Sequence, residues 1–222
     1  TTRATSPHKV HPFNTGQRPR AEGQYRSPRQ SALDDISLSE ITDCLLAACQ
    51  AMKLSDLLVN RSASAMLVQT DILYLTSSGT HTLQRFDLVD ITLSATAAEG
   101  LESQTRSWSH TGQFGGEVFH RDTLVRHAQQ VAQDALALLQ ADNCPSGRMD
   151  LVLMPDQMML QIHESIGHPL ELDRILGDER NYAGWSFVKP QDFGALQYGS
   201  ALMNVSFDPT KANEFASYDF DD

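Results

Sequence analysis

Two histidines and a glutamate stand together in the second half of the sequence, and they are residue types that bind and use a metal ion. The pattern is His163-Glu164, three further residues and then His168, with Pro169 following. Paired imidazoles on one helix, with a glutamate beside the first, are typical of zinc hydrolases, in which the glutamate activates water as a general base. The sequence therefore offers His163 and His168 as metal ligands and Glu164 as the base.

The spacing of these histidines makes a demand on the backbone. In a regular α-helix with 3.6 residues per turn, side chains five positions apart point about 140° away from each other and cannot reach one ion. A single π-type turn adds one residue and brings His168 back over His163. Gly167 tolerates such a distortion, and Pro169 ends the helix directly after it. If the two histidines share one ion, we therefore predict a π-turn at this point, and the sequence offers residues that tolerate it.

The third ligand that a zinc site usually needs is left open by the sequence. Glu171 and Asp173 follow closely enough to bind the ion as an alternative ligand, or to hydrogen-bond a ligand histidine from behind. In the competing interpretation, His163 and His168 are ordinary polar residues near a helix C-terminus, where imidazole interacts favourably with the helix dipole.

The elements that must position these residues indicate an α+β fold, an antiparallel sheet with packed helices. Ser37 and Glu40 have the spacing of a capping box, while Asp122 and Asp156 are expected to cap later helices. Residues 89–96 alternate between apolar and polar, as in a strand with one wet face. In chain order we predict a helix at about 38–53, an antiparallel meander at about 65–111, a helix at about 122–140, a short buried strand at 149–154 and the helix that carries the histidines.

Charge and proline divide the chain into three predicted regions. Residues 1–30 hold six basic residues, one acidic residue and four prolines, which predicts an extended, linker-like segment; a basic functional arm is the alternative. Residues 31–185 are the predicted α+β domain with the histidine motif, and residues 186–222 the start of a truncated, β-rich C-terminal domain.

Composition excludes several classes of protein. No run reaches the ~18 apolar residues of a membrane-spanning helix, so we expect no membrane association. The three cysteines, Cys44, Cys49 and Cys144, form no CxxC pair, which argues against a disulfide scaffold and a four-cysteine zinc module and favours the cytoplasm. We expect Cys44 and Cys49 to be small buried residues of a helix.

The segment Leu160–Arg174 resembles the active-site segment of the TldD/PmbA family of metallopeptidases. The similarity covers nearly the whole chain and is most specific at residues 160–187. It also includes Ala183–Phe187, Tyr198–Ser200 and Ser217–Asp222, and upstream Tyr25–Pro28, Leu75–Gly79, Gln104–Arg106 and Gly115–Gly116.

This resemblance implies the α+β fold leading into a β-rich C-terminal domain, and a zinc-dependent peptidase of small or unfolded peptides. His163 and His168 match the metal-binding histidines and Glu164 the catalytic glutamate, as in the metal-bearing type of subunit. Members form homodimers or heterodimers with a paralogous TldD/PmbA subunit. Their third ligand is a downstream cysteine without a counterpart here, so we expect this chain to be an internal portion of a longer protein.

Two rival functions stay open at this point. A catalytically inactive peptide-binding or partner subunit of the same fold is favoured by the missing cysteine and disfavoured by the intact motif. A DNA-associated regulator, suggested by the family's historical link to gyrase modulation, is disfavoured by the net charge of −11, and we expect no direct contact with nucleic acid. In the hydrolytic interpretation, an extended peptide could add as a strand to the sheet at 89–110.

Overall fold

The computed structural model describes residues 19–212 and 214–221, and they fall into two units. The first unit consists of two segments of the chain, one that ends at Asp142 and one that begins at Phe207. The second unit is the segment between them, Asn143–Ser206. None of the helices in the described ranges is both long and apolar enough to cross a lipid bilayer.

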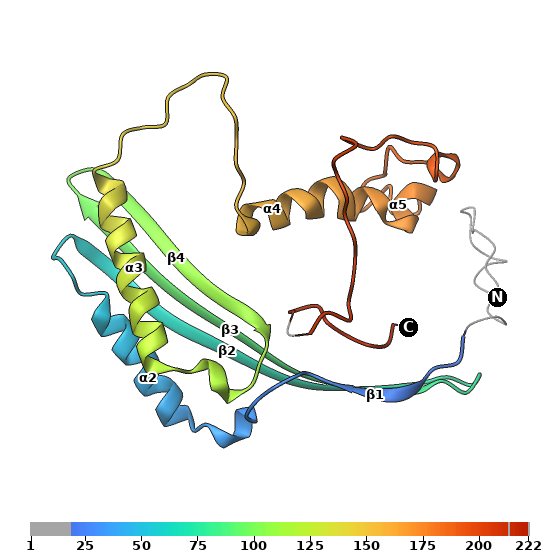
Figure 1. Cartoon of the computed structure of the whole chain (residues 1–222), viewed down its shortest axis with the longest axis horizontal. Coiled ribbons are helices and arrows are strands. Elements are labelled where there is room, and N and C mark those ends of the chain that lie inside the picture. The colour runs from blue at the N-terminus through green and yellow to red at the C-terminus, as the bar shows by residue number, and fades with distance from the viewer. Residues whose placement is uncertain (1–18, 213, 222) are drawn as a thin grey trace. The chain divides into compact units, whose positions relative to one another are not determined.

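The first unit is built on a sheet whose long central strand is β3 (His81–Glu99). One side of β3 pairs antiparallel with β2 (Leu58–Leu75) along nearly its whole length. The other side pairs first with β1 (Glu22–Arg26), in parallel, and then with β4 (Glu102–Gln113), antiparallel (Figure 1). The predicted antiparallel meander is confirmed, and the parallel strand β1 is an addition within residues 1–30.

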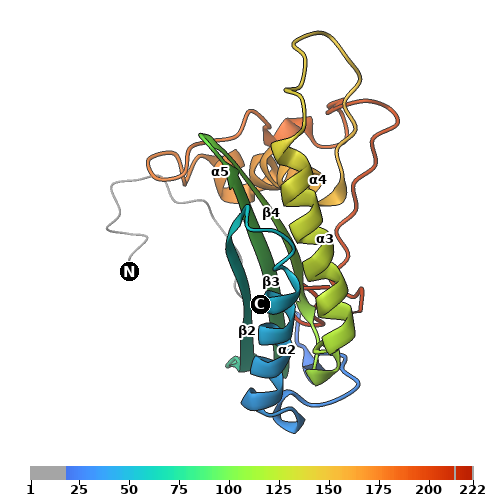
Figure 2. The same cartoon turned by 90° about the vertical axis from the view of Figure 1, so that its left-hand side faces the viewer.

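One face of this sheet is covered by two helices, α2 (Leu38–Ala51) and α3 (Arg121–Leu139), as Figure 2 shows. The predicted alternation of β3 is confirmed, because its apolar residues are fully buried beneath the helices while the polar residues between them lie on the other face. Fully buried residues of β3 are Val89, Ile91, Leu93, Ala95 and Ala97. The architecture is therefore α+β, with the core between one sheet face and two helices.

The helix starts confirm one of the predicted caps and correct two. Ser37 and Glu40 form the expected capping box at α2. At α3 the N-cap is His120, so Asp122 is not the cap and lies instead in the first turn. At the helix before the histidines the N-cap is Met154, since Pro155 occupies the first helical position, and Asp156 again lies in the first turn. Both carboxylates still face the positive end of the helix dipole.

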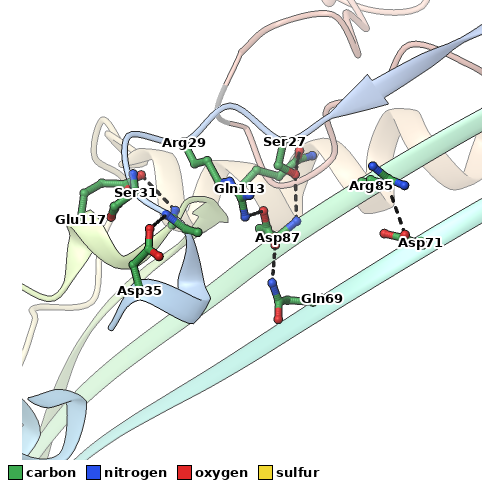
Figure 3. A network of polar contacts seen from close by, with 12 residues as sticks. Ser27, Arg29, Ser31, Asp35, Gln69, Asp71, Arg85, Asp87, Gln113 and Glu117 are labelled. Atoms are coloured by element: carbon green, nitrogen blue, oxygen red, sulfur yellow. Dashed lines mark hydrogen bonds and ion pairs between the residues drawn. The ribbon is translucent and has the colours of Figure 1, made fainter. Parts of the chain in front are cut away.

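A polar network fixes the segment after β1 to the sheet (Figure 3). Asp87 accepts from Arg29 at 2.6 Å and from Gln69 at 3.0 Å. Glu117 accepts from the Ser31 backbone N–H at 3.0 Å and the Gly115 N–H at 2.9 Å. Burial on its own would raise the pKa of the Glu117 carboxyl, but these backbone hydrogen bonds outweigh it and lower that pKa to about 2.

The C-terminal segment rejoins the first unit through two buried glutamines. The side chain of Gln84 donates to the Phe220 carbonyl and accepts from the Asp219 and Phe220 N–H groups. Gln113 donates to the Ser217 carbonyl at 2.6 Å. Side-chain amides thus pair with an extended backbone as a neighbouring strand would, which places this segment with the first unit.

The second unit contains the histidine segment and few buried side chains. It comprises α4 (Pro155–Ile162), the π-helix η4 (His163–Gly167), the 3-10 turns η5 (His168–Leu170) and η6 (Pro190–Asp192), and α5 (Leu172–Leu176). The predicted buried strand at 149–154 is wrong: these residues have no regular structure, and Val152 is 83% exposed. An apolar run becomes a buried strand only where a sheet accepts it, and within the described chain none pairs with it.

The division into units differs from the three regions read from the sequence. Residues 1–18 of the predicted linker lie outside the described residues, and residues 22–26 are β1. The predicted boundary after residue 185 runs through a set of contacts between the histidine segment and residues 183–198, so these segments stay in one unit. Among the described residues of 186–221 the regular structure is η6 alone.

Candidate metal centre

The two histidines lie one above the other because the backbone between them forms the predicted π-turn. The His168 N–H donates to the His163 carbonyl, five residues back, in the bond that defines a π-helix. The two imidazole rings lie with centroids 4.2 Å apart and meet edge to face at 74°. The extra residue thus cancels the 140° separation of a regular helix and places both rings on one side.

Glu164 completes a cluster of three possible ligands. One ligand atom from each of His163, Glu164 and His168 lies within 4.8 Å of the others. The Glu164 carboxylate approaches the Nε2 atom of His163 to 3.8 Å. The side chains of His163 and Glu164 are more than half exposed and that of His168 is 30% exposed, so ions and water reach the cluster freely.

Glu171 and Asp173, which the sequence leaves as equal alternatives, have different surroundings. The Glu171 carboxylate contacts the Nδ1 atom of His168 at 2.7 Å and also accepts from the Arg174 guanidinium. The hydrogen bond with His168 is the first cause of the lowered pKa of the Glu171 carboxyl. Asp173 instead accepts from the neighbouring Arg174 N–H at 2.8 Å. Glu171 therefore holds His168 from behind, while Asp173 has no contact with the cluster in the described structure.

This contact decides which nitrogen of His168 faces outward. A carboxylate on Nδ1 leaves Nε2 free for a metal ion and fixes the plane of the ring, as is usual for metal-ligating histidines. Two imidazole nitrogens and a nearby carboxylate oxygen suit zinc and related divalent ions. The residues present therefore fit a divalent transition metal.

The cysteines do not join this cluster. Cys44 and Cys49 lie on α2, as predicted, and are partly rather than fully buried against the core of the first unit. The Cys44 thiol donates to the Phe119 carbonyl, and burial raises its pKa. Cys144 is exposed and donates to the Pro145 carbonyl, and within the described residues it belongs to no group of metal-binding side chains.

Three residues that sequence reasoning does not single out for a role support the turn. Tyr198 donates its hydroxyl to the Ser165 carbonyl, and the Ser186 hydroxyl donates to the Pro169 carbonyl at 2.5 Å. Arg174, besides contacting Glu171, donates to the Ala183 carbonyl at 2.7 Å. Only Pro169 gives a signal in the sequence: a proline after a helix leaves an earlier carbonyl without its backbone donor.

Comparison with known proteins points to one family. Residues 31–139 match the sequence model of the PmbA/TldA metallopeptidase central domain. Together with the two relatives described next, this match over about half of the chain supports membership of the PmbA/TldD family. The matched range covers α2, the three antiparallel strands and α3, and it ends before the histidine segment.

Two archaeal metalloproteases are similar to the chain over part of its length. A metalloprotease of Methanocaldococcus jannaschii is 32% identical over 112 residues, which is 50% of this chain and 23% of the relative. A metalloprotease of Methanothermobacter thermautotrophicus is 28% identical over 166 residues, which is 75% of this chain and 35% of the relative. The chain thus spans about a quarter to a third of the length of these two relatives.

A solved structure from Thermotoga maritima also aligns with the chain. It is described as that of a suggested modulator of a DNA gyrase, and the alignment covers 62% of this chain and 30% of that one, at 17% identity and a TM-score of 0.43.

Proposed function

We propose that this chain carries the zinc-binding and catalytic segment of a PmbA/TldD-type metallopeptidase that hydrolyses small or unfolded peptides. The observation that carries the proposal is the π-turn, which gathers His163, Glu164 and His168 so that one ligand atom of each lies within 4.8 Å of the others. The metalloprotease names of the two archaeal relatives support the reaction class.

His163 and His168 would hold the ion through their ring nitrogens, and Glu171 would keep His168 oriented. A zinc ion bound by these residues would act as a Lewis acid, polarising a carbonyl and lowering the pKa of bound water to about 7. Glu164 is exposed and adjacent to the proposed ligands, and its carboxylate would take the proton of the attacking water and pass it to the leaving amine.

The substrate, partner and location follow as parts of the same proposal. An extended peptide would pair with a free sheet edge, and β2 and β4 each pair with β3 on one side only within the described residues. The partner would be a second copy or a paralogous subunit of the family, and the cytoplasm its location.

Zinc content tests the metal part of the proposal. The purified chain should contain about one zinc per molecule by elemental mass spectrometry, and the His163→Ala variant should lose it. His120→Ala, an exposed histidine in the first unit, is the matched control and should keep its zinc. Equal zinc in the parent and His163→Ala, or none in the parent, would contradict a metal site at the π-turn.

Glu164→Gln separates metal binding from catalysis. The amide keeps the size of the side chain but cannot take a proton, so zinc should remain while hydrolysis of an unstructured peptide falls by about 10²–10⁴-fold. Hydrolysis by the variant at the parent rate would refute the role of Glu164. A parent that binds zinc and peptide without hydrolysis would instead identify the inactive, peptide-binding subunit.

A further inference from the structure

The carbonyl of Ser165, inside the π-turn, has lost its ordinary backbone partner. In a continuing α-helix it would accept from the N–H of residue 169, but that residue is a proline and has no N–H. A carbonyl left without a partner in a partly buried place weakens the turn. The Tyr198 hydroxyl, 33 residues further on, donates to this oxygen instead.

The Tyr198 ring is held so that its hydroxyl stays at this position. It packs against Phe187 with ring centroids 5.5 Å apart. Ser186 lies between Trp185 and Phe187 in the sequence. Its side chain is buried, and its hydroxyl donates to the Pro169 carbonyl. Ser186 and Tyr198 therefore donate to two carbonyls, that of Ser165 inside the π-turn and that of Pro169 after it, one on each side of His168.

We propose that Tyr198 is a positioning residue of the metal centre: its hydroxyl replaces the backbone donor that Pro169 lacks and so keeps His163 and His168 facing one ion. The residue lies outside the histidine motif, and in the described part of the chain its hydroxyl and ring contact Ser165 and Phe187 and not the three candidate ligands. It acts through the backbone of Ser165, midway between them. The metal readout of the following test rests on the proposed function, whereas the exchange readout does not.

Tyr198→Phe removes the hydroxyl and keeps the ring that packs on Phe187. Tyr182→Phe makes the same change at a tyrosine of the same unit that is 94% exposed, and serves as the control. Without metal, amide hydrogen exchange in residues 163–168 should become about tenfold faster in Tyr198→Phe and stay unchanged in Tyr182→Phe.

Cobalt(II) supplies the second readout, because its visible absorption reports the geometry of its ligands. We expect the Kd for Co²⁺ to rise about tenfold in Tyr198→Phe, with altered absorption bands, and to stay at the parent value in Tyr182→Phe. Exchange rates and Kd within twofold of the parent would overturn the inference. Faster exchange in a chain that binds no Co²⁺ would uphold the support of the turn and refute the metal site.

Pro169→Ala gives a rescue test that a merely structural tyrosine would not pass. Alanine restores an N–H at position 169, which can donate toward the Ser165 carbonyl. On that background Tyr198→Phe should change the exchange rate and the Kd by less than about twofold. An undiminished effect would show that the hydroxyl does not stand in for the missing N–H.

Discussion

Glu117 gives a quantitative test of the polar network in the first unit. One of its carboxylate oxygens accepts from the N–H and the hydroxyl of Ser31, and the other accepts from the Gly115 N–H. Glutamine at this position has one oxygen, so its NH₂ group must face a donor on one of the two sides. We therefore expect Glu117→Gln to leave a backbone N–H without an acceptor.

The magnitude follows from the pKa of the carboxyl. It is about 2 in the folded protein against an ordinary value of 4.5. At about 1.4 kcal/mol per pKa unit, this difference of about 2.5 units corresponds to at most about 3.5 kcal/mol of stability. Because the side chain is only partly buried, solvent screening lowers the expected loss in the variant to about 2 kcal/mol at pH 7.

The pH dependence has a defined sign. A carboxyl whose pKa is lower in the folded state contributes its full stability above its unfolded pKa, and loses that contribution as the pH falls from about 4.5 to about 2. The difference in stability between parent and Glu117→Gln should therefore shrink steadily below pH 4.5. Above pH 5 it should be constant.

Urea denaturation at several pH values measures this difference. Trp108 lies in the first unit, and the other tryptophan of the chain, Trp185, lies in the second, so a Trp185→Phe background makes fluorescence report on the first unit. Glu102→Gln, at an exposed position of β4, is the control and should change the free energy of unfolding by less than about 0.5 kcal/mol. A loss in Glu117→Gln that is equal at pH 7 and pH 3 would refute the reasoning.

Three further substitutions test close approach, backbone freedom and charge burial. Gly115→Ala would place a methyl carbon 1.7 Å from a backbone carbonyl oxygen, so we expect a loss above about 3 kcal/mol in urea denaturation; a stable variant would contradict this packing. Gly167→Ala adds a carbon 4.0 Å from the His163 ring at a helical φ of −58°, so Co²⁺ affinity should stay within about threefold, and a larger drop would show that glycine is required. Asp87→Ala leaves the partly buried Arg29 guanidinium without its carboxylate, so the free energy of unfolding should fall by about 3 kcal/mol. The control, Asp71→Ala, removes an exposed ion pair and should lower it by less than about 1 kcal/mol. Equal losses in the two variants would contradict the difference in burial.

Local sequence signals were sufficient for much of the fold. The Ser37–Glu40 capping box predicts the start of α2, and the alternation at residues 89–96 predicts which side of β3 is buried, because both depend on neighbours a few positions away. β1 has no such signal: its five residues are mostly polar, and it is a strand because its backbone pairs with β3, nearly sixty positions along the chain.

The apolar run at 149–154 shows the opposite error. Its composition is that of a buried strand, yet Leu151 and Val152 are exposed. The hydrophobicity of a segment shows that its burial is favourable. It does not show whether another element of the fold is there to pack against the segment. The contacts of Tyr198 and Arg174 could not be predicted for the same reason. Tyr198 contacts Ser165, 33 positions earlier in the chain, and no local sequence pattern predicts a pair so far apart.

The backbone of the histidine segment could be predicted because two features of its sequence are incompatible with a regular α-helix that binds a metal ion. Two histidines five positions apart cannot share an ion on an α-helix, and a proline one position after the second histidine deprives an earlier carbonyl of its donor. The π-turn answers the first conflict and the Tyr198 hydroxyl answers the second. If His163 and His168 were ordinary polar residues at a helix end, nothing would require the π-turn, and an α-helix that ended at His168 would satisfy the same sequence. In the function proposed above, the turn is needed because both rings must reach one ion, and the amide exchange of Tyr198→Phe tests how much the Tyr198 hydroxyl stabilises it.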